Sequence, residues 1–427
     1  MNTQKATLDS LYHAAVKAAH PSTCLPPFLP APPKDGRIII LAGGKAAGSM
    51  THVAETLYTS QYGLGADRLC GIAVTRIGYA EPTHLVRMIE AGHPLPNEAG
   101  LQGTRDILAL ARTATPQDQV LVLLSGGASA NWIAPVDGLT LADKQMVTRA
   151  LLRSGAPIDA MNTVRKRLSA IKGGRLCVAA YPAPVTTLAI SDIPGDDPTH
   201  LGSGPTVPDT TTRAQALAIL ERYKITLPAP VQALLEDPAN DTPKADHPAF
   251  AASRFALIAR PADGVKASAD LARSLGYTIK DLGAEIEGEA RDVARAHAAL
   301  ALDAAKDGRK LAILSGGELT VTMHGNGRGG PGQEYALALA LALNGHPQIC
   351  AIAGDTDGTD GGSGKPDDPA GAFVFPDTLE RAKAKGMDPQ AFLENNDSTG
   401  FFEAIGDLLC PGPTGTNIND IRVILVG

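Results

Sequence analysis

The sequence predicts an α/β protein that is organised as two domains. The chain has 427 residues, and a single domain commonly holds about 100–200 residues. Short apolar runs alternate with Ala-rich segments of helical pattern, which is typical of parallel sheets covered by helices on both faces. We therefore expect a doubly wound α/β fold. Strands are predicted at residues 37–42, 71–75, 120–124, 186–190, 255–259, 311–314, 348–353, 371–375 and 422–426.

The boundary between the two domains is predicted from a change in composition. Residues 235–250 (LEDPANDTPKADHPAF) are polar, acidic and rich in Pro, as expected for a linker. They separate a first domain at residues 1–240 from a second domain at residues 250–427. Helical patterns are expected at residues 1–20, 265–275, 288–306 and 376–385.

The composition excludes several classes of protein. The net charge is −7, from 38 basic and 45 acidic residues, so nucleic acid is not the expected partner. No apolar stretch reaches the roughly 18 residues that a membrane-spanning helix needs. Residues 1–20 lack the apolar core of a signal peptide, so we expect a cytoplasmic protein. The five scattered cysteines include no CxxC pair, which favours reduced thiols over a disulfide framework or a zinc site.

A glycine-rich turn follows the first predicted strand, in the segment LAGGKAAGSM. Gly43, Gly44 and Lys45 lie there between a strand and a helix. Glycines let backbone N–H groups approach an anion closely, and a lysine adds a full positive charge. The turn is therefore a candidate anion-binding loop. A plain strand-to-helix turn with a surface lysine is the alternative.

A second turn of this kind occurs in LLSGGASANW, where Ser125, Gly126 and Gly127 follow a predicted strand. A ligand loop and a structural turn are equally compatible with the pattern. A nucleophilic serine is not favoured, because the G-x-S-x-G spacing is absent.

A basic segment, residues 159–176, is predicted as a helix that Gly173 and Gly174 close. Arg165 belongs to a run of three basic residues in this segment. Such charges usually form a solvated helix face, and the functional alternative is a patch that faces a phosphate.

Acidic, glycine-rich segments follow two other predicted strands. Asp192, Asp196 and Asp197 lie in SDIPGDDPTHLGSGP, and Asp355 lies in AGDTDGTDGG. Carboxylates at the end of a strand suit a Mg²⁺ site or a base that accepts a hydroxyl proton. A solvated loop is the alternative, particularly for the second segment.

The segment GNGRGGPGQ contains Asn326, Gly327, Arg328, Gly329 and Gly330, and an Ala/Leu-rich segment follows it. Although YALALALAL alternates by two, its composition and the preceding Pro predict a helix. The glycines match the G-x-G-x-x-G dinucleotide pattern formally, but the motif does not lie on a first βαβ unit. An arginine in such a loop is better suited to bind a phosphate or a carboxylate with two hydrogen bonds.

The chain resembles the class II (MOFRL-type) glycerate kinases in nine segments that follow one another in the same order. The resemblance extends over residues 5–427, and no motif is broken. The nine segments are AGGKAAG, AGHPLPNE, LLSGGASA, NTVRKRLSAIKGGRL, SDIPGDDPTHLGSGP, LSGGELTV, GRGGPGQE, AGDTDGTDG and TNINDIRVIL.

The resemblance implies ATP-dependent phosphorylation of D-glycerate to 2-phosphoglycerate with Mg²⁺, in carbon metabolism. It implies an N-terminal Rossmann-like domain, a smaller α/β MOFRL domain, and an active site in the cleft between them. It also implies that Lys45 and Arg328 are active-site residues. We expect small-molecule partners and a monomer or homodimer.

Roles for the remaining residues follow as hypotheses. Lys45 and Arg328 would bind the transferring phosphoryl group and the glycerate carboxylate, in either order. Asp192 would be the base or a Mg²⁺ ligand, with Asp355 and Glu318 as second choices for the metal. The other expected substrate- or phosphate-binding residues are Gly43, Gly44, Ser125, Gly126, Gly127, Arg165, Asn326, Gly327, Gly329 and Gly330.

Two other functions compete with the kinase. An NAD(P)H-dependent hydroxypyruvate reductase would use the loop at residues 327–332 for the dinucleotide and would need a proton donor, for which His324 is the nearest histidine. A glycerate-binding sensor would bind glycerate without turnover, and no segment for DNA binding or output is evident.

Overall fold

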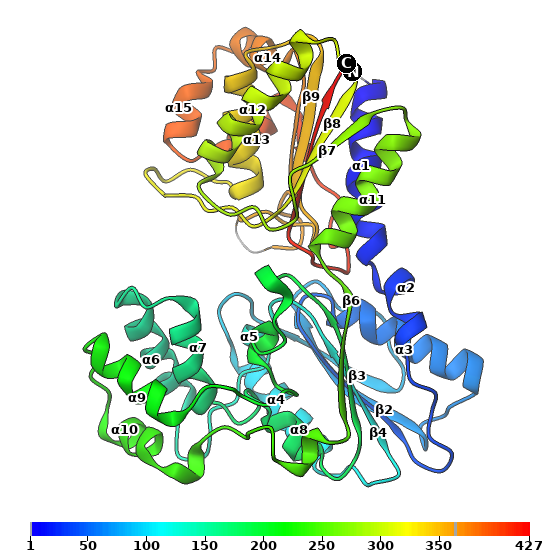
Figure 1. Cartoon of the computed structure of the whole chain (residues 1–427), viewed down its shortest axis with the longest axis vertical. Helices are drawn as coiled ribbons and strands as arrows, with labels where there is room; N and C mark the ends of the chain where they lie inside the picture. The colour runs from blue at the N-terminus through cyan, green and yellow to red at the C-terminus, as the bar shows by residue number, and fades with distance from the viewer. Residues whose placement is uncertain (1, 363–364) are drawn as a thin grey trace. The chain divides into compact units, whose positions relative to one another are not determined.

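The computed structural model describes residues 2–362 and 365–427. The chain divides into two compact units (Figure 1). The central unit is Leu25–Ile258, and the C-terminal unit combines the N-terminal segment up to Cys24 with Ala259–Gly427.

This division differs from the predicted boundaries of 1–240 and 250–427 in two places. Helix α1 (Asn2–Ala19) packs with the C-terminal unit, where Tyr12 donates a 2.7 Å hydrogen bond to the carbonyl oxygen of Asp355. The supposed linker, residues 235–250, lies inside the central unit, where Asn240 accepts a hydrogen bond from Arg175. An amphipathic pattern does not indicate which sheet a helix covers, and polar composition does not distinguish a linker from a loop that binds buried cations.

The central unit contains a six-stranded sheet in the order β3-β2-β1-β4-β5-β6, which is the Rossmann order. Strands β1 to β5 pair in parallel. The chain reverses its direction of progress across the sheet between β1 and β4, the position where open α/β sheets bind ligands. The doubly wound prediction is confirmed here. The strands are β1 (Ile38–Gly43), β2 (Leu69–Arg76), β3 (Val86–Ala91), β4 (Gln119–Leu124), β5 (Val185–Ile190) and β6 (Ser253–Ala259).

Helices cover this sheet and also form a group of their own. Helix α3 packs on β1 and β2, while α4 and α8 contribute to the large apolar cluster on the sheet. A separate apolar cluster joins α6, α7, α9 and α10. The helices are α3 (Ala47–Tyr62), α4 (Glu98–Ala111), α5 (Ala128–Asn131), α6 (Leu141–Arg153), α7 (Ile158–Arg167), α8 (Arg175–Ala180), α9 (Arg213–Arg222) and α10 (Ala229–Glu236).

The C-terminal unit also has six strands, in the order β11-β10-β9-β12-β8-β7, but its sheet is mixed. Only the β7–β8 pair is parallel among the described pairs; β12 runs antiparallel to both β8 and β9. The expectation of a parallel sheet is therefore wrong for this unit. The strands are β7 (Thr278–Asp281), β8 (Leu311–Gly317), β9 (Ile349–Asp355), β10 (Gly371–Val374), β11 (Leu408–Leu409) and β12 (Asp420–Val426).

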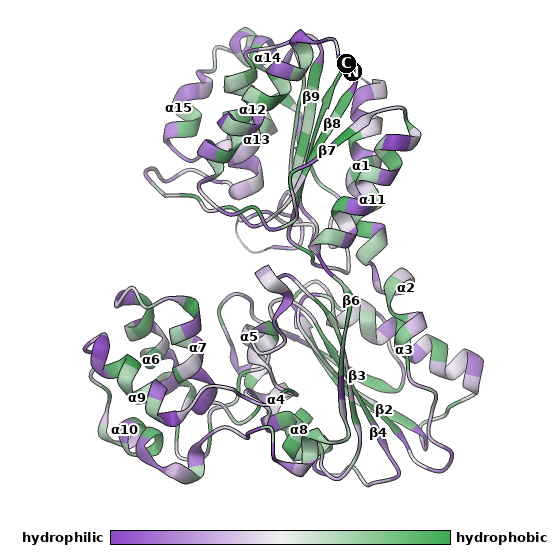
Figure 2. Cartoon of the chain, in the orientation of Figure 1, coloured by the Kyte–Doolittle hydropathy of each residue, from purple (hydrophilic) through white to green (hydrophobic). Residues whose placement is uncertain are grey.

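The error has a physical cause. Strand β12 is buried along its whole length, because α1 and α11 cover one face of the sheet while α12 and α13 cover the other (Figure 1). Burial on both faces produces a continuous apolar run in either strand direction. Hydrophobic residues, shown in green in Figure 2, are accordingly concentrated on the strands of the sheet. The helices are α1, α2 (Pro21–Cys24), α11 (Pro261–Ser274), α12 (Ala290–Lys306), α13 (Pro331–Leu343), α14 (Thr378–Ala384), α15 (Pro389–Glu394) and α16 (Ser398–Ile405).

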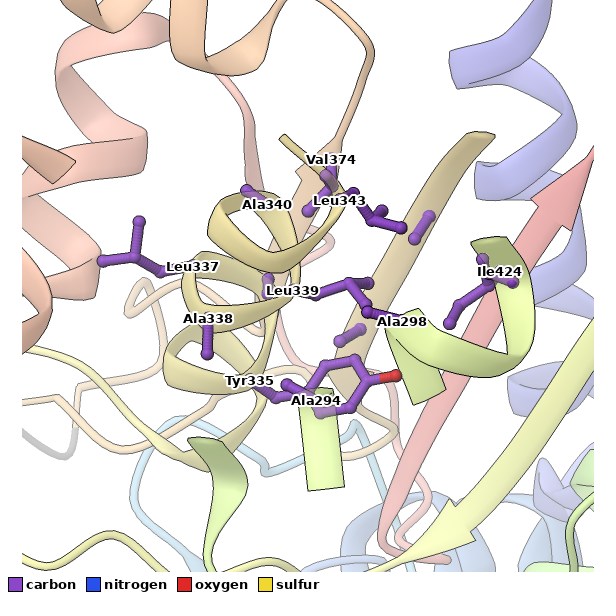
Figure 3. Packing of buried hydrophobic residues seen from close by; sticks show 14 of the residues in the cluster. Ala294, Ala298, Tyr335, Leu337, Ala338, Leu339, Ala340, Leu343, Val374 and Ile424 are labelled. Atoms are coloured by element: carbon purple, nitrogen blue, oxygen red, sulfur yellow. The ribbon is translucent and has the colours of Figure 1, made fainter. Parts of the chain in front are cut away.

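The Ala/Leu segment forms helix α13, as its composition predicts. The helix is buried nearly all round, which explains why its sequence lacks a clear 3.6-residue period. Tyr335 and Leu339 lie beside Ala294 and Ala298 of α12 in the apolar cluster of this face (Figure 3). Such small residues allow the two helices to approach closely. Within the described part of the chain, no helix has the length and apolar character needed to cross a membrane.

Substitution Tyr12→Ala tests the assignment of α1 to the C-terminal unit. Tyr12 is fully buried, and truncating a buried aromatic side chain costs about 3–5 kcal/mol. Amide hydrogen exchange should therefore accelerate in α11, β9 and β12, while β1 and β4 keep their protection. Tyr62→Ala, at a half-exposed tyrosine of the central unit, is the matched control and should change little. Faster exchange in β1 and β4 instead would contradict the assignment.

Candidate active site

Two glycine-rich turns meet at the carboxyl ends of β1 and β4 in the central unit. The amide of Lys45 donates to the carbonyl oxygen of Gly126 at 2.8 Å, and the amide of Ala46 donates to Ser125 Oγ at 2.9 Å. Gly44 has φ +117°. A Cβ at Gly44 would lie 2.4 Å from Ser125 Oγ and 2.5 Å from the carbonyl oxygen of Ser125. This position therefore requires glycine, both for its backbone conformation and for the close approach of the second turn.

The side chain of Lys45 lies beside the second turn. A Cβ at Gly127, which has φ +80°, would come within 3.1 Å of Lys45 Cγ and 3.0 Å of His93 Cδ2. Among the described residues, no acceptor partners the amides of Gly126 and Gly127. The turn thus combines a lysine, an imidazole and two backbone donors.

His93 is not among the residues predicted for the site, and it follows strand β3 after one intervening residue. Its position at the carboxyl end of a parallel strand, in the segment AGHPLPNE, was the available signal. Gly43, by contrast, serves packing: a Cβ there would lie 2.4 Å from the buried indole of Trp132. The small residue is required by the protein core at this position.

Asp192 follows β5 after one residue and is half-buried. Because β5 neighbours β4 in the sheet, Asp192 shares the carboxyl edge with Lys45 and the Ser125 turn. The structure therefore brings these predicted residues to one edge of one sheet.

A hydroxyl pair and a lysine lie next to the Ser125 turn. Ser129 Oγ is 2.7 Å from Ser203 Oγ, and Lys172 Nζ donates to Ser129 Oγ at 2.6 Å and to its carbonyl oxygen at 2.8 Å. Burial, together with the charges of Arg165 and Lys144, lowers the pKa of Lys172 well below its usual value. Lys172 follows Arg165 closely in the sequence, whereas Ser129, Ser203 and Lys144 come from other segments.

The helix predicted over residues 159–176 is not continuous in the structure. Helix α7 ends at Arg167, and Gly174 begins α8 instead of closing α7. Lys172 therefore lies in an irregular turn between the two helices. Its side chain is buried and contacts Ser129. Arg165 Nη1 donates to Asn162 Oδ1 at 3.3 Å.

The Arg328 loop belongs to the C-terminal unit, and most of its polar groups bind within the protein. The amide of Gly327 donates to the carbonyl oxygen of Asn395 at 2.9 Å, and the amide of Arg328 donates to Asp397 Oδ1 at 3.1 Å. The guanidinium of Arg328 is exposed and donates to Glu403 Oε2 at 2.7 Å. The backbone of the loop is thus held within the protein, while the Arg328 side chain is exposed.

The glycines of this loop are required by close packing. A Cβ at Gly327 would lie 2.4 Å from Asp397 Cβ, and one at Gly329 would lie 2.1 Å from Ser398 Oγ. A Cβ at Gly330 would lie 2.2 Å from Asp360 Oδ1. Asn326 is exposed, and its amide donates to Asn395 Oδ1 at 3.3 Å.

The first turn of α13 is occupied by a carboxylate. Asp360, which is 2% exposed, accepts hydrogen bonds from the amides of Gly332 at 3.2 Å and Gln333 at 2.7 Å. Burial and the nearby charge of Asp420 raise the pKa of Asp360. In a dinucleotide fold these helix amides would bind the pyrophosphate, so this loop does not have the geometry of a dinucleotide site.

The second-choice metal ligands lie at two strand ends of the C-terminal unit. Asp355 ends β9, where its Oδ1 accepts the amide of Asp357 at 2.9 Å, and Asp420 is its partner across the ladder. Glu318 follows β8 and is exposed. In the described ranges, no three His, Cys, Asp or Glu side chains are grouped to hold a metal ion. Residues 363 and 364 of the acidic segment lie outside those ranges.

Comparison with known proteins agrees with this architecture. Residues 7–236 match the family described as "Domain of unknown function (DUF4147)", and residues 311–420 match the "MOFRL family". A protein of Agrobacterium vitis named "Putative hydroxypyruvate reductase" is 44% identical, over 99% of this chain and 94% of its own length. The "D-glycerate 2-kinase" of Thermotoga maritima is 37% identical over 96% of both chains.

A solved structure extends the comparison to three dimensions. The crystal structure of glycerate kinase from Thermotoga maritima matches with a TM-score of 0.88 and 34% identity, over 100% of both chains. Identity above 30% along nearly the whole length, together with both family matches, shows common descent. The chain belongs to the class II, MOFRL-type glycerate kinase family.

Proposed function

We propose that the protein catalyses the ATP-dependent phosphorylation of D-glycerate to 2-phosphoglycerate. The observation that carries the proposal is the turn pair at the Rossmann switch point, where Lys45 lies beside the amides of Gly126 and Gly127. Phosphoryl transfer depends on positive charge and oriented donors around the phosphoryl oxygens more than on a covalent nucleophile. The turn pair supplies both.

Lys45 and Arg328 have complementary roles in this proposal. One would stabilise the transferring phosphoryl group and the other would bind the glycerate carboxylate, in either order. Arg328 suits an oxyanion because a guanidinium offers paired donors in a fixed plane. Binding of the substrate or of phosphate is also proposed for Ser125, Arg165, Asn326, Gly329 and Gly330. The location of the active site in a cleft between the domains stays a prediction from the sequence.

Asp192 would orient the attacking hydroxyl or bind Mg²⁺. The available donors fit this metal, because Mg²⁺ usually takes one or two carboxylates together with phosphate oxygens and waters. A group of three protein ligands is therefore not required. Asp355 and Glu318 remain the second choices, and the bound metal would neutralise phosphate charge.

A hydroxypyruvate reductase is the competing function, since two of the relatives carry the name "Putative hydroxypyruvate reductase". In a reductase, His93 beside the Lys45 turn would be a better placed proton donor than His324, the histidine nearest to the loop in sequence. Asp360 nevertheless occupies the helix amides that a dinucleotide would need. The kinase is therefore the better-supported function. The cytoplasmic location and the monomeric or dimeric state stay predictions from the sequence.

Two parallel assays of the purified protein decide between these functions. ADP release with ATP, Mg²⁺ and D-glycerate, followed by phosphorus NMR of the product, should reveal 2-phosphoglycerate. Oxidation of NADH or NADPH with hydroxypyruvate should not exceed the background rate. The opposite pair of results would reject the kinase, and glycerate binding without either turnover would indicate a sensor.

Substitutions Lys45→Ala and Arg328→Ala should each lower kcat by at least about a hundredfold, the scale of losing a group that stabilises transition-state charge. Steady-state ADP release measures the effect. Arg295→Ala is the matched control for Arg328, because Arg295 is likewise an exposed arginine paired with a carboxylate in the same unit. Turnover near that of the wild type in either Ala variant would remove the residue from the proposed site.

Substitution Asp192→Asn should lower kcat by at least about tenfold, because the amide can neither accept a proton nor bind Mg²⁺ as a carboxylate does. The rate is measured as a function of Mg²⁺ concentration. A raised Mg²⁺ requirement would identify a ligand, whereas a lower kcat at unchanged requirement would identify the base. Full kcat with unchanged Mg²⁺ dependence would contradict both roles. The control is Asp67→Asn, at an exposed aspartate that precedes β2, and it should behave as the wild type does.

Substitution Gly44→Ala should destabilise the central unit and reduce turnover, because the new methyl group would meet Ser125 and force the two turns apart. Gly138→Ala is the control, since Gly138 also has a left-handed φ of +88° but has no atom within 4 Å of a Cβ. Backbone strain alone costs about 1–2 kcal/mol. In urea unfolding, Gly44→Ala should lower the free energy of unfolding by at least about 2 kcal/mol more than Gly138→Ala does. Equal decreases for the two variants would show that the contact between the turns is unimportant.

A further inference from the structure

A group of buried cations in the central unit has no carboxylate partner. Lys144 on α6 is 2% exposed, Lys172 is 1% exposed, and Arg165 on α7 is half-buried. None of the three forms an ion pair with any residue in the described ranges. We call these three residues the cation cluster.

Adjacent residues of the same helix show how buried cations are otherwise accommodated. Lys166 Nζ lies 3.3 Å from Asp209 Oδ1, and Arg167 Nη2 lies 2.9 Å from Asp241 Oδ1. These contacts provide the charge compensation that a buried cation needs. Arg165, which precedes these two residues on α7, has no such acidic partner among the described residues.

Hydrogen bonding within the cation cluster is also incomplete. Lys144 Nζ and Arg165 Nε have no acceptor among the described residues. Among the described residues, the ammonium group of Lys172 donates only to Ser129, whose hydroxyl pairs with Ser203. The charges of Arg165 and Lys144 both act on Lys172, so the three cations lie near one another. The acceptors that the described residues offer to their side chains are the neutral oxygens of Ser129 and Asn162.

This arrangement is unfavourable for the protein alone. Burial and the charges of Arg165 and Arg175 lower the pKa of Lys144 to about 7, and burial likewise lowers the pKa of Lys172. A multiply charged anion would remove the repulsion and supply the absent acceptors. The cluster is therefore strained without an anion and complementary to one.

We propose that the cation cluster binds a phosphoryl group, with Arg165, Lys172 and the Ser129 hydroxyl as direct contacts and Lys144 as the charge behind them. A phosphoryl group matches the cluster better than a carboxylate does, because it carries up to two negative charges and three terminal oxygens. Ser129 is two residues beyond Gly127, so the bound group would adjoin the turn of Lys45. The inference rests on the proposed function for the source of the ligand, either the nucleotide or the phosphorylated product.

Binding without turnover tests the inference. Isothermal titration of the full chain would measure the affinity for tripolyphosphate, ADP and 2-phosphoglycerate in the wild type and in Lys144→Met, Lys172→Met and Arg165→Gln. Each variant should weaken tripolyphosphate binding at least tenfold. Lys224→Met, at an exposed lysine of the same unit, should bind as the wild type does.

The other two ligands identify the source of the phosphoryl group. Weaker ADP binding with unchanged 2-phosphoglycerate binding would assign the cluster to the nucleotide, and the reverse would assign it to the product. Wild-type affinity for all three ligands in every cluster variant would overturn the inference.

Stability without ligand separates binding from a structural role. Methionine fills nearly the same space as lysine without its charge, so Lys144→Met should unfold at the same or a higher temperature than the wild type. The advantage should be largest below pH 7, where Lys144 is protonated in both the folded and the unfolded protein, and should shrink as the pH rises toward 10.5. A markedly lower unfolding temperature would show that the charge supports the fold, which would overturn the inference.

The outcomes for the two proposals are distinguishable. Loss of anion binding in the cluster variants of a protein that does not phosphorylate glycerate would uphold the cation cluster and reject the kinase. Normal glycerate phosphorylation with unaltered anion binding in the variants would uphold the kinase and reject the cluster.

Discussion

The close approach of the Gly44 turn to the Ser125 turn is the constraint on which the site of the central unit depends. Both turns emerge from neighbouring parallel strands, and their backbones touch because Gly44 has no side chain. The hydrogen bond from Lys45 to Gly126 then holds the turns in register. The backbone of Lys45 is thereby held beside the second turn.

Positive charge in the central unit is arranged in two ways. Lys166 and Arg167 join loops through Asp209 and Asp241, so they stabilise the fold, including the Pro-rich stretch that resembles a linker. Arg165 and Lys172, close to them in the sequence, form no ion pair with an acidic residue in the described part of the chain. One short segment thus carries both cations that are paired with acids and cations that are not. Under the proposal above, the unpaired cations are the ones that bind the phosphoryl group.

Glycine has different uses in the two units. At Gly44 and Gly127 it permits a left-handed backbone beside Lys45 and His93. Around Arg328 it permits the loop to lie against Asp397, Ser398 and Asp360. Glycine-rich segments therefore form a turn with backbone N–H donors in the central unit. In the C-terminal unit they form a tightly packed loop that carries the exposed Arg328.

The sequence by itself determined the α/β class, most of the strands, the helix of the Ala/Leu segment and the family. These features depend on local composition and on the order of motifs, both of which can be read along the chain. Strand β3 escaped detection because its side chains are partly exposed and include charges, which removes the apolar run.

Only the tertiary structure decided the direction of β12, the attachment of α1 to the C-terminal unit and the meeting of Lys45 with His93. It also decided that Lys172 faces inward beside Ser129. Each of these depends on contacts between segments far apart in the chain. A buried strand has the same apolar pattern in either direction, and an amphipathic helix pattern does not indicate which sheet the helix packs on. The site residues could thus be proposed one turn at a time, while their grouping required the fold.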